Sequence, residues 1–213
     1  MKLEEFCQAP IHGILFDMDG TLVGSPLIFS KVREDINKEG GSISEKMLVL
    51  EYISELEKSS PKMAEMARQI VDKHEEFAVK NSVLYPGVME LFCYLEQEQI
   101  KKAIITRNSR RAAETVKSRY NLSIDLIVAR DITPVKPDPF PLSYACRMLN
   151  LRNDEVITVG DHDIDIEAGK RAGIRTVFAL QREHSYKFIE QADIYVRSLS
   201  EIIGICKKAN HNQ

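Results

Sequence analysis

Short apolar runs rich in Val and Ile alternate with helix-like patterns through most of the chain. The runs fall at residues 11–16, 102–106, 125–129, 156–160 and 176–180. Runs of this length, bounded by turn residues, are typical of buried strands. Between most of them, apolar residues recur every three or four positions, as in Val88, Leu91, Phe92 and Leu95. This alternation predicts an α/β fold in which helices cover both faces of a mostly parallel sheet.

The segment at residues 26–80, which follows the first run, has a different pattern. It carries three helical stripes, which are Ile28, Val32 and Ile36; Leu48, Val49, Tyr52, Ile53 and Leu56; and Met63, Met66, Ile70, His74 and Phe77. Gly40-Gly41 and Ser59-Ser60-Pro61 separate the stripes. We therefore expect a Rossmann-like core domain at residues 1–24 and 82–213, with an all-helical cap domain inserted at residues 25–81. The Met-rich stripe should pack in the cap core, and His74 should be a core or boundary histidine and not a ligand.

Composition narrows the class of protein. The 213 residues include 29 Lys and Arg against 32 Asp and Glu, so the chain lacks the basic field that nucleic-acid binding needs. We see neither a signal-peptide pattern nor an apolar run long enough to cross a bilayer. The four cysteines lack zinc-ligand spacing, and Cys93 and Cys146 sit in apolar helical contexts that suggest core thiols. We expect a cytoplasmic protein, monomeric or homodimeric, without nucleic-acid or membrane partners.

Polar side chains follow each strand that could line a common crevice. They are Asp17 and Asp19; Thr106, Arg107 and Asn108; Lys136 in VKPDP; and Asp161, Asp163 and Asp165 in GDHDID. Functional groups of open parallel sheets gather beyond the carboxyl ends of the strands. For Asp17 and Asp19, the alternative without a chemical function is a strand that ends in an Asx turn before Gly20. For Lys136 it is a surface lysine.

Several carboxylates around one crevice require a cation to offset their repulsion. Oxygen ligands without nearby His or Cys favour Mg²⁺ over Zn²⁺. An EF-hand calcium loop is excluded, because Ile166 and Ala172 occupy the positions that require Gly and Glu. A hard cation, the ammonium of Lys136 and the hydroxyl of Thr106 together suit a phosphoryl group.

These segments resemble the four motifs of the haloacid dehalogenase-like hydrolase superfamily. DMDGTL, the Thr after the next core strand, the Lys before Pro and GDHDIDIEAG occur in the order of those motifs. The helical insertion resembles the small cap of that superfamily, and the phosphoglycolate phosphatase-like enzymes are the subfamily that the chain looks most similar to. The resemblance implies a phosphatase that hydrolyses a small phosphorylated metabolite through an aspartyl-phosphate.

The resemblance also implies residue roles. Asp17 would be the nucleophile, and Asp19 the acid that protonates the leaving alcohol and the base that activates water. Mg²⁺ would be bound by Asp17, Asp19 through its backbone carbonyl, Asp161 and Asp165. Thr106 and Lys136 would complete the catalytic set and bind the transferring phosphoryl oxygens, and Lys136 would keep Asp17 ionised. The full set implied to contact substrate is Gly20, Thr21, Thr106, Arg107, Asn108 and Lys136.

Three positions depart from the superfamily pattern. His162 replaces a small hydroxyl residue, Ile164 replaces a polar one, and Arg107 replaces the Asn that commonly follows the Thr of the second motif. Arg107 either reaches the substrate or forms an ion pair. Asp163 either joins the site or lies in a solvated loop.

Other functions stay open at this point. A receiver domain also combines acidic residues, Thr and Lys around Mg²⁺, but it has no helical insertion after its first strand. A catalytically silent phosphoryl-binding protein could use the same fold. A phosphomutase of the β-phosphoglucomutase type would share the aspartyl-phosphate. For the substrate, we expect the cap loop at residues 38–44 to contribute to specificity.

Overall fold

The chain forms two compact units. The computed structural model describes residues 2–179 and 189–211. One unit comprises Met1–Gly24 and Val83–Gln213, and the other comprises Ser25–Ser82. Each unit has its own set of buried apolar side chains.

The first unit is built on a parallel sheet, as predicted. Its strands are β1 (Gly13–Phe16), β4 (Lys101–Ile105), β5 (Leu126–Val128), β6 (Val156–Gly160), β7 (Arg175–Ala179) and β8 (Ile194–Val196). They lie in the order β5-β4-β1-β6-β7-β8, and every neighbouring pair is parallel. The predicted strand at residues 156–160 has the observed bounds, whereas the others differ by one or two residues at their ends. Leu180, the last residue of the fifth predicted strand, lies outside the described residues.

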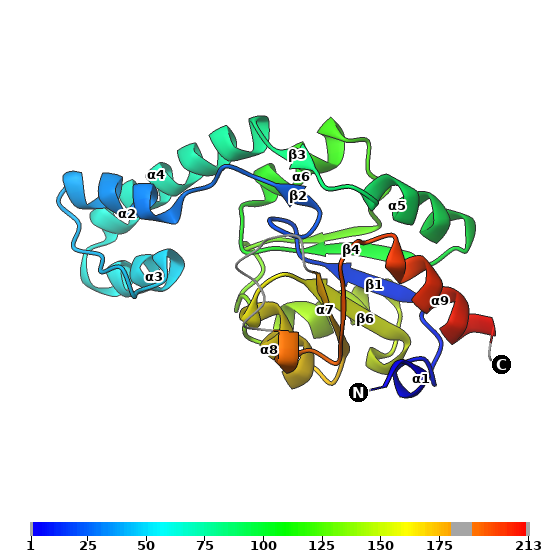
Figure 1. The fold of residues 1–213 in the computed structure, drawn as a ribbon. Coiled ribbons are helices and arrows are strands. Elements are labelled where there is room, and N and C mark those ends of the chain that lie inside the picture. The colour runs from blue at the N-terminus through cyan, green and yellow to red at the C-terminus, as the bar shows by residue number, and fades with distance from the viewer. Residues whose placement is uncertain (1, 180–188, 212–213) are drawn as a thin grey trace. The chain divides into compact units, whose positions relative to one another are not determined.

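Helices cover both faces of this sheet (Figure 1). They are α1 (Leu3–Phe6), α5 (Val88–Gln97), α6 (Arg110–Arg119), α7 (Phe140–Leu149), α8 (Asp163–Arg171) and α9 (Glu201–His211), with a 3₁₀ turn at Asn153–Glu155. Leu142 of α7 and Ala168 of α8 share one apolar cluster with Leu15 and Ala103 of the sheet. On the other face, α5 packs against α9. The predicted α/β class is therefore confirmed.

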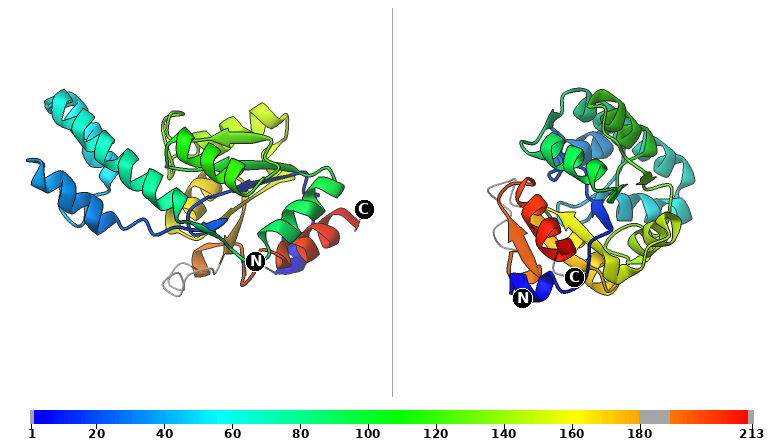
Figure 2. Two further views of the ribbon diagram at one scale, coloured as in Figure 1. Left: turned by 90° about the horizontal axis from the view of Figure 1, so that it is seen from above. Right: turned by 90° about the vertical axis from the view of Figure 1, so that its right-hand side faces the viewer.

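The two ends of the described chain lie side by side at one end of this unit (Figure 2). The side chain of Asn210 in α9 accepts a hydrogen bond from Ile11 N at 2.8 Å and donates one to Ile11 O at 3.1 Å. Cys7 and Cys206 are buried nearby, and the Sγ of Cys7 donates to Ile205 O. The last helix therefore holds the segment that leads into β1.

A short two-stranded antiparallel sheet forms where the chain leaves and re-enters the first unit. β2 (Val23–Gly24) pairs with β3 (Val83–Leu84) in antiparallel register. The sequence analysis missed β2, β3 and β8. β2 and β3 have only two residues each, which is too short to show periodicity, and β8 (Ile194–Val196) has no longer apolar run around it.

The second unit consists of α2 (Phe29–Lys38), α3 (Val49–Ser59) and α4 (Pro61–Lys80). Its core combines side chains of all three helices, including Ile36, Ile53 and Val71. Pro61 stands in the first turn of α4, where its missing N–H leaves no helix hydrogen bond unmade.

The buried face of α4 differs from the predicted one. Ala64, Ala67 and Val71 are buried, whereas Met63 and Met66 are only half-buried and Phe77 is 61% exposed. The buried stripe lies one position further along the chain, because small alanines allow α2 and α3 to approach closely. His74 lies at the boundary, as expected, with its Nε2 2.9 Å from Asp35 Oδ2.

The expectation that Cys93 is a core thiol was wrong. Cys146 is buried, but Cys93 is exposed on α5, opposite the face formed by Leu91 and Leu95. Among the described residues, no helix has the length and apolar character needed to cross a bilayer.

Candidate active site

The predicted site residues meet beyond the carboxyl ends of three adjacent strands. Asp17 follows β1, Thr106 follows β4 and Asp161 follows β6. Because β1 lies between β4 and β6 in parallel register, these three strand ends lie side by side. The topology therefore brings together residues that are up to 144 positions apart in the sequence (17 to 161).

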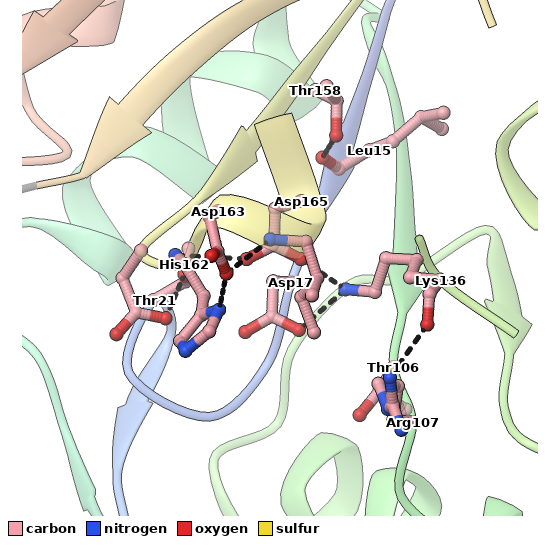
Figure 3. A network of polar contacts seen from close by, with 12 residues as sticks. Leu15, Asp17, Thr21, Thr106, Arg107, Lys136, Thr158, His162, Asp163 and Asp165 are labelled. Atoms are coloured by element: carbon pink, nitrogen blue, oxygen red, sulfur yellow. Dashed lines mark hydrogen bonds and ion pairs between the residues drawn. The ribbon is translucent and has the colours of Figure 1, made fainter. Parts of the chain in front are cut away.

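Lys136 links two of the carboxylates (Figure 3). Its Nζ lies 2.7 Å from Asp17 Oδ1 and 2.6 Å from Asp165 Oδ1. The side chain of Lys136 is only 4% exposed, so water screens these ion pairs weakly. The surface-lysine alternative for Lys136 is wrong.

Three carboxylates form a compact group that could hold a metal ion. Asp17, Asp161 and Asp165 each offer one oxygen, and these oxygens lie within 4.8 Å of one another. Thr21 Oγ1, fully buried, donates to Asp161 Oδ1 at 3.5 Å. The carboxylates outnumber the ammonium of Lys136, and an all-oxygen donor set with excess negative charge fits a hard divalent cation.

Burial and charge set the protonation of this group. The pKa of Asp17 is raised to about 8: burial is the main cause, the ammonium of Lys136 acts to lower the pKa, and the carboxylates of Asp165 and Asp161 act to raise it. For Lys136, burial acts to lower the pKa, but Asp165 and Asp17 outweigh it and raise the pKa above its ordinary value. Lys136 thus remains charged, yet it does not by itself bring the pKa of Asp17 to the usual range of a carboxyl group. An additional cation would act in that direction.

A hydrogen bond from Asn108, which follows the neighbouring strand β4, orients the side chain of Asp19. Asn108 Nδ2 donates a hydrogen bond to Asp19 Oδ2. Asn108 is itself fixed, because its N–H donates to Thr106 Oγ1 at 3.1 Å and its carbonyl accepts from Arg130 N at 3.1 Å. The sequence analysis assigned Asn108 to substrate binding only, and no pattern in the sequence indicated the contact with Asp19.

A tight turn separates the two aspartates from β2. Gly20 has a φ of +94°, and its N–H donates to Val23 O at 2.8 Å. A side chain at this position would be strained, which explains why Gly follows Asp19. The turn places Thr21 beside Asp161.

The first turn of α8 places Asp163 and Asp165 differently. Asp165 is buried, and its Oδ2 accepts a hydrogen bond from His162 N at 3.2 Å. Asp163 is 41% exposed, pairs with His162 Nδ1, and is not part of the three-carboxylate group. Asp163 is therefore solvent-exposed and outside the carboxylate group, but it begins α8 and does not lie in a loop.

Arg107 turns toward the backbone that carries Lys136. Its Nη1 donates a hydrogen bond to Lys136 O at 2.8 Å (Figure 3). This hydrogen bond is a contact besides the two predicted alternatives, a substrate contact and an ion pair.

Comparison with known proteins identifies the family. The sequence profile described as haloacid dehalogenase-like hydrolase matches residues 14–179. An uncharacterized hydrolase of Saccharomyces cerevisiae, YOR131C, is 34% identical over 94% of this chain and 93% of its own. The N-acetylmuramic acid 6-phosphate phosphatase of Pseudomonas aeruginosa is 28% identical over 93% of this chain and 96% of its own.

A solved structure shows the same fold. A hydrolase from Pseudomonas syringae superposes with a TM-score of 0.74 at 21% identity, covering 91% of this chain and 96% of that one. The chain belongs to the haloacid dehalogenase-like hydrolases. The predicted family and enzyme class, a haloacid dehalogenase-like phosphatase, are confirmed.

Proposed function

We propose that this protein is a Mg²⁺-dependent phosphatase that hydrolyses a small phosphorylated metabolite through an aspartyl-phosphate on Asp17. The observation that carries this proposal is the position of Lys136, which binds Asp17 and Asp165 at the edge of the three-carboxylate group. A buried ammonium beside a carboxylate nucleophile favours both the charged nucleophile and an incoming phosphoryl group.

In the first half-reaction, a carboxylate oxygen of Asp17 attacks phosphorus, and the bond to the leaving alcohol oxygen breaks. Asp19 gives its proton to that oxygen, so the alcohol leaves neutral. Asp19 then takes a proton from water as the water attacks the phosphorus of the aspartyl-phosphate. Inorganic phosphate leaves, and Asp17 is regenerated as a carboxylate. The hydrogen bond from Asn108 keeps Asp19 oriented for both proton transfers.

Asp17, Asp161 and Asp165 would hold Mg²⁺ together with the backbone carbonyl of Asp19. When bound, Mg²⁺ supplies positive charge that offsets the charge of the phosphoryl oxygens. Thr106 and Lys136 would donate to the same oxygens. Gly20 and Thr21 belong to the proposed substrate-contact set through the turn that they form, in which their N–H groups donate to Val23 O and Met18 O. Asn108 belongs to the proposed substrate-contact set as well.

The second unit, Ser25–Ser82, would act as a cap that selects the leaving group. Its loop at residues 38–44 is ordered by its own unit, since Asn37 Oδ1 accepts from Ile43 N at 2.8 Å. We keep this loop as the proposed specificity element. The P. aeruginosa relative is named for a phosphorylated amino sugar, which supports a small phosphorylated metabolite as the substrate class. A phosphoglycolate-like substrate and a cytoplasmic location complete the proposal.

The test is a panel of phosphorylated metabolites assayed for phosphate release with Mg²⁺ and with EDTA. We expect release with Mg²⁺ only, and none from the Asp17→Asn variant. The Asp163→Asn variant is the matched control and should keep its activity, because Asp163 stands outside the carboxylate group. Activity that survives EDTA would overturn the mechanism. Sugar phosphates that interconvert without phosphate release would identify a mutase, and inactivity across the panel would identify a binding protein.

A further inference from the structure

The segment that carries Lys136 has no regular secondary structure. It lies between β5 and α7, and Lys136 stands in a turn in which Asp138 N donates to Val135 O at 3.0 Å. The lysine side chain is long and flexible, yet its Nζ must contact Asp17 and Asp165 together. The position of its main chain therefore decides whether the ammonium reaches both carboxylates.

Arg107 connects this main chain to the sheet. It follows Thr106 directly at the end of β4, an inner strand that pairs with both β1 and β5. Its guanidinium donates to Lys136 O at 2.8 Å, and its side chain is half-buried. A charged donor makes a stronger hydrogen bond than a neutral one, so this contact ties the turn firmly to β4.

A second arginine contacts the next carbonyl from a different element. Arg171, at the end of α8, donates from Nη1 to Pro137 O at 3.2 Å. Its side chain is 48% exposed and also pairs with Glu167. The same kind of hydrogen bond is therefore longer and more open to water at Pro137 than at Lys136.

We propose that Arg107 is a positioning residue for the phosphatase reaction, and that it acts by holding the main chain of Lys136 so that the ammonium spans Asp17 and Asp165. The inference rests on the proposed function, because the ammonium of Lys136 needs this position only if it is to bind a phosphoryl group beside Asp17. This role is distinct from the predicted substrate contact of Arg107, and the kinetics below separate the two.

Kinetics with p-nitrophenyl phosphate and Mg²⁺ provide the first test. A small displacement of a catalytic group costs roughly ten- to a hundredfold in rate, so Arg107→Gln should lower kcat by about that factor. KM should change less than about threefold, because transition-state and not ground-state interactions are lost. Arg107→Lys keeps a charged donor, so its kcat should lie between those of the wild type and Arg107→Gln. Arg171→Gln should stay within about twofold of the wild type, since its bond is solvent-exposed.

Amine acetylation followed by mass spectrometry provides a second test that needs no activity. Lys136 and Lys102 are 3% and 4% exposed, so both should react slowly in the wild type. Arg107→Gln should increase the rate at Lys136 severalfold and leave the rate at Lys102 unchanged. An equal increase at both would mean general loosening and would overturn the proposal.

Three other results would also count against the positioning role. A raised KM with unchanged kcat would make Arg107 a substrate ligand. Equal losses in Arg107→Gln and Arg171→Gln would mean that both contacts hold this turn alike and that Arg107 has no special positioning role. Unchanged kinetics and unchanged labelling would leave Arg107 without a role. If the wild type hydrolyses no phosphomonoester, the proposed function fails, and the labelling at Lys136 still decides the inference.

Discussion

Gly160 lies directly against Asp165. A Cβ on Gly160 would stand 2.5 Å from Asp165 Oδ2, closer than real side-chain contacts allow. The last residue of β6 must therefore be Gly for the first turn of α8 to bring Asp165 to Lys136. Gly160 is part of the GDHDID segment, but the sequence analysis gave it no role.

Gly160→Ala should displace Asp165 and, with it, the ion pair to Lys136. Overpacking of this kind costs about 1–3 kcal/mol in the free energy of unfolding. We also expect at least about a tenfold loss of kcat, because a catalytic charge moves. Urea unfolding and phosphatase kinetics measure the two effects.

Gly204→Ala is the matched control for this substitution. Gly204 lies in α9, and a Cβ there would meet nothing within 4 Å. Gly204→Ala should raise the free energy of unfolding by about 0.5–1 kcal/mol, since Gly is unfavourable inside a helix. A Gly160→Ala variant with wild-type activity would contradict the proposed importance of the Gly160–Asp165 contact.

Mg²⁺ binding should depend on Asp161 and not on Asp163. The wild type should gain thermal stability when Mg²⁺ is added, because a ligand that binds only the folded state stabilises it. Asp161→Asn removes the negative charge of one of the three clustered carboxylates and should lose most of this shift. Asp163→Asn removes the same charge two residues away and should keep it. Differential scanning fluorimetry across a Mg²⁺ titration measures the shift, and equal shifts in the two variants would refute the proposed metal site.

In the metal-free protein, the contribution of Asp17 to stability should fall with rising pH. Burial raises the pKa of Asp17 from 3.8 to about 8, so between these values the folded protein binds more protons than the unfolded chain. The free energy of unfolding then decreases by up to about 1.4 kcal/mol per pH unit across that window. Asp17→Asn cannot ionise and should lack this contribution. Urea unfolding in EDTA from pH 4 to pH 8 compares the slopes, and identical slopes would show that Asp17 titrates normally.

Loss of Asn108 should impair proton transfer by Asp19 more than phosphate binding. Asn108→Ala removes the donor to Asp19 Oδ2 and should lower kcat about tenfold on an alkyl phosphate, whose leaving alcohol needs a proton. On p-nitrophenyl phosphate, whose leaving group needs little protonation, the loss should be smaller. Steady-state kinetics on both substrates test the difference.

Asn153→Ala controls for the loss of an asparagine side chain. Asn153 donates to Ala172 O at 2.6 Å and is not part of the carboxylate site. It should leave both rates unchanged. Equal losses on the two substrates in Asn108→Ala would instead indicate a role of Asn108 in phosphate binding.

The sequence by itself determined the fold class and the chemical groups of the site. Buried parallel strands must be apolar along their whole length, so β1 and β6 stand out as continuous runs. The polar residues that follow them must lie at one edge of the sheet. Asp17, Lys136, Asp161 and Asp165 could therefore be predicted from their position after a strand and from their resemblance to family motifs. The roles of these residues in catalysis remain predictions.

Only the tertiary structure decided how these groups are held. The contacts of Asn108 with Asp19, of Arg107 with Lys136 and of Gly160 with Asp165 join different elements, and no local periodicity records them. The same holds for the buried face of α4, where close packing favours alanines over the larger Met63 and Met66. Periodicity reports which residues avoid water along one element. The partner of each side chain depends on how separate elements pack, and that is fixed only when the chain folds.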